Sequence, residues 1–356
     1  MRIMATIKDV SRLANVSIST VSRVINKSAN VAPEKEQAVL KAMKELNFQP
    51  NSFAQALVNK RSNCIGVLVG DLCGGPFFAQ MMRGIEDVIL PEKKYVIVMS
   101  GNHNHDREKD CIEALLLRRC DALIIHSKAL SDDELIEFNQ SGIPMVFVNR
   151  LVNSLEDRSV WVDITAGMAD AVRHLIANGH RKIAYICSDD ATFADEKDRM
   201  AGYKQALEEA GIEFDPNIVS AAFPDENGGY RAIESLLMRD AGFTAFVAYN
   251  DAMAIGAISA LTDNNIAVPG QVSAVGYDDN PISNYIKPKL TTVRYPIEEV
   301  GKRAATLALS LLYDRAEEFN WRWPLKFAPV LIEKSSVAQV KPEDGEKKPA
   351  RKTAKK

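Results

Sequence analysis

Apolar residues in the first 50 positions recur at helical spacing in three short stretches. The first, residues 7–14, follows Thr6, which opens a Thr-x-x-Asp pattern typical of a helix N-cap. Asn15 suits a left-handed turn, and Ser17 can cap a second helix whose apolar side is Val21, Val24 and Ile25. Pro33 favours the first turn of a third helix. The pattern predicts a small all-α module.

From residue 64 onward, short apolar runs alternate with helical stretches. Continuous apolar runs at 65–69, 96–99, 122–125 and 145–148 are typical of parallel strands that are buried on both faces. A second series has runs at 160–163, 183–187, 246–249 and 273–276. Helical stretches separate the runs, as in βαβ units. The sequence therefore predicts two doubly wound α/β lobes.

Composition excludes several classes of protein. Apolar residues make up 46% and charged residues 26%, which are ordinary globular values. The longest apolar runs are far shorter than the roughly 18 residues of a membrane span. The first nine residues lack the apolar region of a signal peptide, and the five cysteines form no Cys-x-x-Cys pair. We expect a cytoplasmic protein with no membrane contact, no metal and no disulfide framework.

The net charge of −3 conceals an asymmetry. Residues 1–62 carry ten Lys/Arg against four Asp/Glu, and residues 341–356 carry seven against three. The stretch between them carries 27 against 40. Basic ends on an acidic body suggest an anionic partner, most often nucleic acid, although charge alone fits chance clustering on a solvated face equally well.

The two short helices around a tight turn have two interpretations. The second helix carries short polar residues and Arg23 outside its apolar side, as a helix that enters the major groove of DNA would. An ordinary αα-hairpin in a helical core has the same periodicity, so periodicity does not separate the two.

Specific motifs favour the first interpretation. Residues 6–10, 13–17 and 20–26 resemble the DNA-binding head of the LacI/GalR family of bacterial repressors, and residues 50–57 resemble its hinge helix. The resemblance continues to about residue 337. Residues 120–135, 248–257 and 290–297 are most similar to the galactose-responsive members of the family.

The resemblance implies a domain organisation. A helix-turn-helix head spans 5–50, and a hinge helix with its linker spans 51–63. A periplasmic-binding-protein-like core spans 64–337, with lobe one at about 64–162 and 294–321 and lobe two at about 163–293 and 322–337. The chain then crosses between lobes near 163, 293 and 322. A disordered basic tail, 338–356, lacks the leucine heptads of a coiled coil.

The resemblance also implies roles in DNA binding. Arg23 contacts bases or phosphates, and Ile18 and Ser19 occupy the specificity-determining pair, where galactose repressors usually carry Val-Ala. Leu57 matches a leucine that wedges between base steps in the minor groove; without the resemblance it reads as a core leucine. The contacts expected mostly to position the backbone are Thr6, Ser17, Thr20, Ser22 and Asn26, and Asn51 and Ala54 are further expected DNA contacts.

Polar residues follow several of the predicted strands, where α/β sheets bind ligands. Carboxylates, amides and Arg side chains suit a polyol, although each residue alone also suits a helix N-cap, an interpretation we favour for Asp251 and Asp279. The resemblance adds Arg199 as a ligand contact and two phenylalanines that pack on the ligand ring. The predicted effector contacts are Asp71, Phe78, Asn149, Arg199, Phe223, Asn250 and Asp278.

Two local features bear on the effector and on metal binding. The segment 71–78 is one residue longer than in galactose repressors and carries Gly74-Gly75, a pliable rim that can alter which sugar fits. His103 and His105 form a His-x-His pair, which we interpret as a solvated loop because no further metal ligands surround it.

We therefore expect a homodimeric repressor of galactose-utilisation genes that binds near-palindromic double-stranded operator DNA and is released by D-galactose. The alternatives are a repressor that responds to another sugar or a nucleoside, and a sugar-binding transport protein. A transport protein needs a signal peptide and has no use for residues 5–59. An enzyme needs a base or nucleophile arrangement that the sequence lacks, so we expect neither catalysis nor a cofactor.

Overall fold

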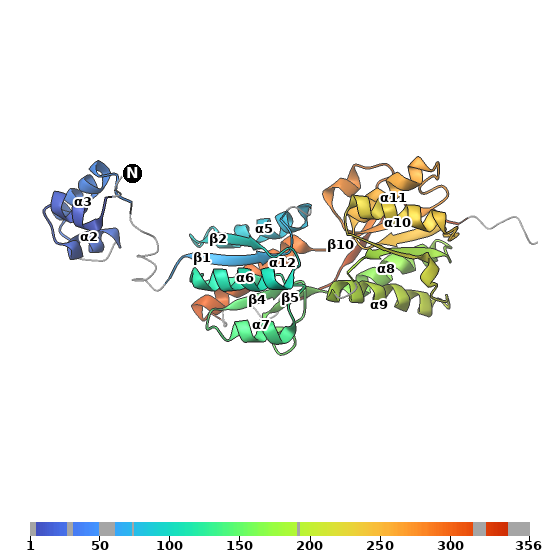
Figure 1. Ribbon diagram of the computed structural model, residues 1–356, viewed down its shortest axis with the longest axis horizontal. Coiled ribbons are helices and arrows are strands. Elements are labelled where there is room, and N and C mark those ends of the chain that lie inside the picture. Colours follow the sequence, from blue (N-terminus) through green and yellow to red (C-terminus); the bar gives the residue numbers. More distant parts are fainter. Residues whose placement is uncertain are drawn as a thin grey trace, which may run out of the picture.

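The computed structural model describes residues 5–26, 31–49, 61–72, 75–190, 193–315 and 325–340. Figure 1 shows a small helical head followed by two α/β lobes. None of the described helices is long and apolar enough to cross a membrane. The described cysteines, 64, 111, 120 and 187, form no disulfide, and all but Cys64 are buried.

Three helices form the head: α1 (Ile7–Leu13), α2 (Ile18–Ile25) and α3 (Pro33–Glu45). The Thr6–Asp9 capping box starts α1, and Asn15 has the left-handed φ of 51° that the turn before α2 requires. Leu13 belongs to the apolar residues at helical spacing in the first predicted stretch, but it is 46% exposed. The buried centre of the head is Val10, Val21, Val24, Val39 and Ala42.

Lobe one contains a parallel sheet with the strand order β11-β5-β4-β3-β1-β2. Its strands are β1 (Cys64–Val69), β2 (Tyr95–Ser100), β3 (Ala122–Ile125), β4 (Met145–Val148), β5 (Ser159–Val162) and β11 (Lys326–Phe327). Alternate strand residues face opposite layers: Val67 packs with α5 (Pro76–Ile89) and α12 (Ile297–Tyr313), and Leu68 packs with α6 (His105–Leu117) and α7 (Asp132–Asn139). The predicted apolar runs 65–69, 122–125 and 145–148 are therefore buried on both faces, whereas 96–99, in the edge strand β2, is only partly buried.

The helices α5 and α12 approach each other through two glycines. A Cβ on Gly84 would lie 2.0 Å from the carbonyl oxygen of Glu298, and a Cβ on Gly301 would lie 2.3 Å from that of Met81. Backbone contact of this kind leaves no room for side chains, so α12 is fixed tightly on lobe one although it follows lobe two in the sequence.

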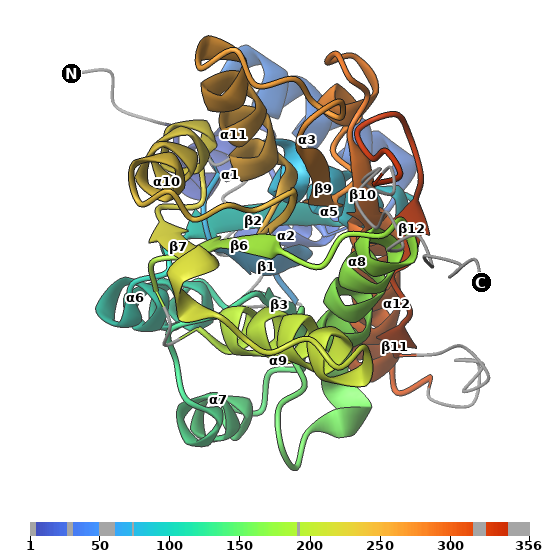
Figure 2. The same ribbon diagram turned by 90° about the vertical axis from the view of Figure 1, so that its right-hand side faces the viewer.

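Lobe two repeats this plan with the strand order β12-β10-β9-β8-β6-β7. Its strands are β6 (Ile183–Ser188), β7 (Val219–Ala222), β8 (Ala245–Ala248), β9 (Ser273–Asp278), β10 (Thr291–Arg294) and β12 (Val330–Ile332), of which β12 is antiparallel to β10. Figure 2 shows α8 (Ile164–Ala177) and α9 (Ala194–Glu209) on one side of the sheet and α10 (Glu226–Met238) and α11 (Asp251–Asp263) on the other. The short 3₁₀ helices are Glu156–Arg158, Pro216–Ile218 and Pro281–Asn284.

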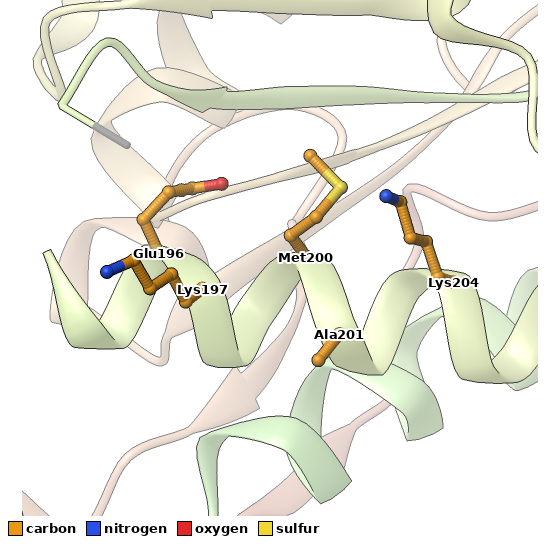
Figure 3. A pocket seen from close by; sticks show the side chains of 5 residues that line it. All are labelled: Glu196, Lys197, Met200, Ala201 and Lys204. Atoms are coloured by element: carbon orange, nitrogen blue, oxygen red, sulfur yellow. The ribbon is translucent and has the colours of Figure 1, made fainter. Parts of the chain in front are cut away.

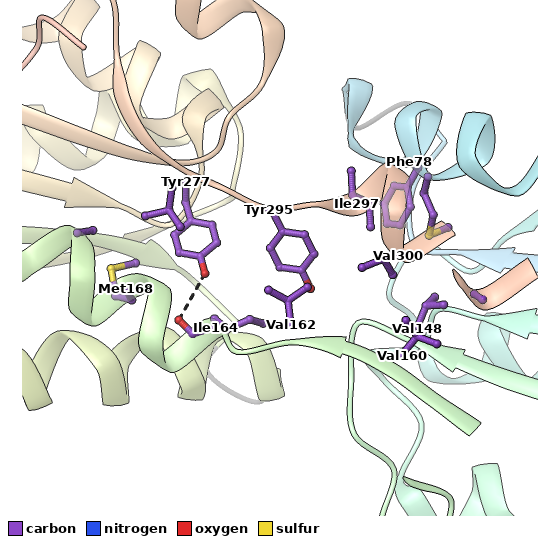
Figure 4. Close-up of a cluster of buried hydrophobic side chains, with 14 of the residues drawn as sticks. Phe78, Val148, Val160, Val162, Ile164, Met168, Tyr277, Tyr295, Ile297 and Val300 are labelled. Carbon is purple, nitrogen blue, oxygen red and sulfur yellow. Dashed lines mark hydrogen bonds between the residues drawn. The ribbon is translucent and has the colours of Figure 1, made fainter. Parts of the chain in front are cut away.

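The chain passes between the two sheets three times: after β5, after β10 and after β11. The third passage corrects the expectation of a crossing near 322, because Lys326 and Phe327 still pair with β5 in lobe one. Buried apolar side chains line the crossings and join the cores of both lobes, with Tyr295 between Tyr277 on one side and Ile297 on the other (Figure 4).

The expected start of a disordered tail at residue 338 is also wrong. The backbone N–H of Ala338 donates to the Ser273 hydroxyl at 3.0 Å, and that of Val340 donates to the carbonyl of Asn178 at 2.9 Å. Residues 338–340 therefore pair with lobe two, and the rest of the expected tail lies outside the described residues.

Candidate functional site

The N-terminal half of α2 presents a polar surface beside one apolar side chain. The Ser17 hydroxyl accepts the backbone N–H of Thr20 at 3.1 Å and lies 2.7 Å from the Ser19 hydroxyl and 2.8 Å from the Thr20 hydroxyl. Ile18 is 45% exposed, while Val21 is fully buried against the head core. The arrangement places the N-terminus of α2, with the exposed residues 17–19, at the surface, where it can face an anion such as a DNA phosphate.

The other residues expected to bind DNA occupy varied positions. Ser22 and Asn26 are partly buried and bonded to each other at 3.3 Å, and Arg23 is exposed on α2. The hydroxyl and backbone N–H of Thr6 are both bonded to Asp9, so its observed contacts are those of a helix cap. Asn51, Ala54 and Leu57 lie outside the described residues.

A second group of side chains meets between the lobes, at the carboxyl ends of the strands. Arg199, on α9, is 4% exposed, and its guanidinium lies 4.2 Å from the ring centre of Tyr249 and 4.6 Å from that of Tyr277. Its Nε donates to the Tyr249 carbonyl at 3.0 Å, and its Nη1 donates to the Asp195 carboxylate at 3.2 Å. Two aromatic rings and two hydrogen bonds therefore fix the guanidinium.

Asp278 ends β9 with a strained backbone. Its φ of 108° is rare for a residue with a Cβ, and such strain is often found at binding sites. Burial raises the pKa of Asp278 to about 7, and the positive charge of Arg199 opposes that shift. The carboxyl group is thus near its midpoint of ionisation at neutral pH, beside a fixed cation.

Lys128 connects the two lobes directly. It lies in the loop between β3 and α7 of lobe one, and its Nζ donates to the Asp195 carboxylate at 2.7 Å and the Tyr249 hydroxyl at 3.0 Å, both in lobe two. Burial works to raise the pKa of Asp195, but the charges of Lys128 and Arg199 outweigh it and hold that pKa below its usual range.

Comparison with known proteins places both parts of the chain in a family. Residues 6–51 match the model of bacterial regulatory proteins of the lacI family, and residues 172–336 match a periplasmic-binding-protein-like domain. The chain is 41% identical to the transcriptional regulator GalR of Escherichia coli K12, over 94% of this chain and 96% of GalR. It belongs to the LacI family. The regulator GalS of Salmonella typhimurium is 42% identical over 94% of this chain and 97% of its own length.

Solved LacI-family structures share the fold. A Lac repressor dimer bound to operator and the anti-inducer ONPF superposes with a TM-score of 0.80 at 27% identity, over 94% of this chain and 100% of the other. The chain therefore has the head and the two-lobed core of a LacI-family protein.

Two histidines of this LacI-family chain, His103 and His126, meet between the lobes. The expectation of a solvated His-x-His loop is therefore wrong for His103, whereas His105 is exposed on α6. The His103 ring lies 5.9 Å from that of His126 and 5.7 Å from that of Phe193. Phe78, a predicted effector contact, lies edge-on to His126 at 4.9 Å. Burial lowers the pKa of His103 to about 4, and that of His126 well below its usual value. Both rings are neutral at physiological pH.

The remaining predicted effector residues are less closely gathered. Asp71 is near enough to His103 for its charge to act on the His103 pKa. The Asn149 side-chain oxygen accepts the Tyr295 hydroxyl at 3.2 Å, and Phe223 is 58% exposed after β7. Asn250 caps α11 by accepting the Met253 N–H at 2.8 Å, and it donates to the Pro224 carbonyl at 2.9 Å.

The expected capping roles of Asp251 and Asp279 are wrong. Asp251 lies inside the first turn of α11, where its carboxylate accepts the Thr292 hydroxyl at 2.6 Å and the Asn280 N–H at 2.7 Å. Asp279 pairs with Lys334 at 2.9 Å and with Arg294 at 2.8 Å. Both carboxylates hold the strand ends of lobe two in place.

The side chains that meet between the lobes form what we call the inter-lobe site: Phe78, His103, His126, Lys128, Asp195, Arg199, Tyr249 and Asp278. Sequence reasoning predicted Phe78, Arg199 and Asp278 as effector contacts and missed the others. His126 and Lys128 follow the predicted strand 122–125 directly, so the strand-end rule that selected Asp71 would have found them. Asp195 precedes Arg199 by four residues, the spacing at which two side chains of one helix are neighbours, so the sequence could have paired it with Arg199.

A hollow on α9 is separate from this group. Glu196, Lys197, Met200, Ala201 and Lys204 line it, all from one helix (Figure 3). It contains no predicted effector residue, and Glu196 is already engaged by the Tyr185 hydroxyl and the Ser188 N–H. In the described part of the chain, no group of three or more His, Cys, Asp or Glu residues is placed to hold a metal ion.

Proposed function

We propose that this chain is a homodimeric transcriptional repressor that binds operator DNA through α2 and is released when D-galactose binds in the inter-lobe site. The observation that carries the proposal is the group formed by Arg199, Asp278 and Lys128 between two lobes that share a chain with a helix-turn-helix head.

The chemistry of the inter-lobe site favours a neutral sugar. A sugar hydroxyl both donates and accepts, and the Asp278 carboxylate and the Arg199 guanidinium offer an acceptor and donors side by side. Tyr249 and Phe78 add aromatic surface of the kind that packs on a pyranose ring. The GalR and GalS relatives support galactose as the effector.

The head supports DNA as the partner. Ile18, Ser19 and Arg23 are exposed on α2, where side chains can reach base edges in the major groove, and residues 1–62 carry a net positive charge of six. One head reads only a few base pairs, so two heads related by two-fold symmetry suit a near-palindromic site. We assign Asn51, Ala54 and Leu57 to the hinge contacts in the minor groove.

Selection of bound duplexes from a randomised pool tests DNA recognition with the full chain. We expect near-palindromic sequences, and we expect Arg23→Ala to weaken their binding by about 1–3 kcal/mol while Arg181→Ala, on lobe two, has no effect. Enrichment of sequences without two-fold symmetry contradicts the dimeric model.

Titration of the selected duplex complex with sugars tests the effector. D-Galactose should release the DNA, whereas D-glucose, D-ribose and adenosine should not. Release by ribose or adenosine instead refutes galactose and retains the sugar- or nucleoside-responsive repressor.

A further inference from the structure

The loop that follows β3, residues 127–130, is largely buried although it belongs to no helix or strand. Ser127 is 3% exposed and Leu130 is 2% exposed. We call this segment the lysine loop, because Lys128 extends from it to lobe two. Buried backbone N–H and C=O groups are almost always paired, so a buried loop outside the sheet must find its partners among side chains.

Glu108, on α6, binds the N–H side of the lysine loop. It is fully buried in lobe one. Its Oε2 accepts the Ser127 hydroxyl and the Ala129 N–H, the latter at 3.2 Å, and its Oε1 accepts the Lys128 N–H at 3.4 Å. The Ser127 hydroxyl in turn accepts the Leu130 N–H at 3.3 Å. One carboxylate therefore fixes three successive N–H groups of the loop, two of them directly and the third through a hydroxyl.

Arg150, which follows β4, binds the carbonyl side of the same loop. Its Nη1 donates to the Leu130 carbonyl at 2.8 Å and to the Ser127 carbonyl at 3.4 Å, and its Nη2 pairs with the Asp132 carboxylate. An acceptor on the N–H groups and a donor on the carbonyls hold the backbone of the lysine loop in one conformation.

The fixed loop determines where lobe one presents the Lys128 ammonium. That ammonium donates to the Asp195 carboxylate at 2.7 Å and to the Tyr249 hydroxyl at 3.0 Å, both in lobe two. We propose that Glu108 is a positioning residue: by fixing the lysine loop it holds the Lys128 ammonium in place for Asp195 and so sets how readily the lobes close on an effector. This inference deepens the proposed function and rests on it.

The size of the effect follows from the cost of ordering the loop. Fixing the backbone of one residue changes an equilibrium constant by about five- to thirtyfold. Without Glu108, the loop would have to become ordered at the moment when Lys128 meets Asp195. The ratio of closed to open protein, and with it the apparent effector affinity, should then fall about tenfold.

Calorimetric titration of the full-length protein with D-galactose measures this loss. Glu108→Leu removes the acceptor and should bind the sugar about tenfold more weakly than the wild type. Glu108→Gln keeps an oxygen that can accept the Ser127 hydroxyl and the Ala129 N–H, so its affinity should recover to within about threefold of the wild type. Glu113→Leu, at an exposed position of the same helix, is the matched control and should bind the sugar as the wild type does.

A double-mutant cycle with Lys128→Met separates positioning from a merely structural role. In that background Glu108→Leu should weaken sugar binding no further, because no ammonium remains to be positioned. The same further loss in both backgrounds overturns the inference, and so does wild-type affinity for Glu108→Leu. If Glu108→Leu fails to fold, Ser127→Ala replaces it in the same cycle, with an expected loss of about threefold in the wild-type background only.

Small-angle scattering of the same four proteins without sugar separates this inference from the effector assignment. Glu108→Leu should enlarge the radius of gyration of the wild type and leave that of Lys128→Met unchanged. If D-galactose does not bind the wild type, the assignment of galactose fails and the scattering cycle alone decides on Glu108. An equal increase in both backgrounds, or no increase in either, overturns its positioning role.

Discussion

The Lys128 bridge gives a direct test of how the lobes are held together. Replacing Lys128 with Met keeps most of the side-chain length and removes the ammonium that bonds Asp195 at 2.7 Å and Tyr249 at 3.0 Å. Removing one partner of a buried ion pair costs about 3–5 kcal/mol when the other charge is left alone. Here Asp195 keeps Arg199 at 3.2 Å and the Tyr249 hydroxyl, so we expect a smaller cost of about 2 kcal/mol.

Lys128 and Asp195 belong to different lobes, so their bond stabilises the closed form, in which the two side chains meet, relative to an open form in which they do not. A shift of about 2 kcal/mol changes the ratio of closed to open protein about thirtyfold. Since an effector that bridges both lobes binds the closed form, its apparent affinity falls by up to the same factor. The operator affinity of the sugar-free protein does not measure the strength of the Lys128 bridge, because the DNA-binding head takes no part in that contact.

Calorimetric titration with D-galactose and small-angle scattering of the sugar-free protein measure the two effects. We expect Lys128→Met to bind the sugar up to about thirtyfold more weakly and to have a larger radius of gyration. Lys197→Met, an exposed lysine on the helix that carries Asp195, is the matched control. Wild-type affinity and wild-type dimensions for Lys128→Met would refute the role of the bridge.

Three further predictions follow from the same structure. Ser17→Ala removes the cap of α2 and should destabilise the head by about 1 kcal/mol, seen as faster amide exchange in residues 18–26 with an unchanged urea midpoint of the core. Burial raises the pKa of Asp278 to about 7, so the stability it contributes is fully present below about pH 4 and is lost as the pH rises through 7. A sugar hydroxyl that donates to the ionised carboxylate should therefore bind about tenfold more tightly at pH 8 than at pH 6, and Asp278→Asn should show no such slope. Asp121→Ala leaves the buried Lys94 ammonium and the N–H groups of Ser62 and Asn63 unpaired and should lower the unfolding free energy by about 3–5 kcal/mol in urea titration, with the exposed Asp133→Ala as control.

Much of the fold was predictable because its strands are buried on both faces. Runs such as Cys64–Val69 are continuously apolar, a pattern that amphipathic helices do not have, and the helices between them are long enough to show their period. Four strands were missed. β11 has two residues and β12 three, too few to display a period, and the polar residues of β7 (VSAA) and β10 (TTVR) interrupt an apolar run. The helix α12 was overlooked although its buried positions, from Ile297 to Ala308, recur at helical spacing.

The candidate site was predictable only in part. Residues at strand ends, such as Asp71 and Asp278, follow from the geometry of parallel sheets, and Arg199 followed from the family resemblance. The pairing of Lys128 with Asp195 did not, because it depends on how two separately folded sheets face each other across three crossings. Nor does the sequence reveal that His103 turns inward, since its neighbour His105 lies half-exposed on α6.

The late return of the chain to lobe one sets the order in which the protein can be made. The sheet of lobe one takes its edge strand from Lys326–Phe327, and one of its faces is covered by α12, held by Gly84 and Gly301. A ribosome must therefore deliver more than nine-tenths of the 356 residues before the sheet of lobe one has its last strand, whereas the head has its own core by residue 48. A message truncated before α12 encodes a complete head core, joined to a lobe that lacks one helix of its covering layer and its last strand.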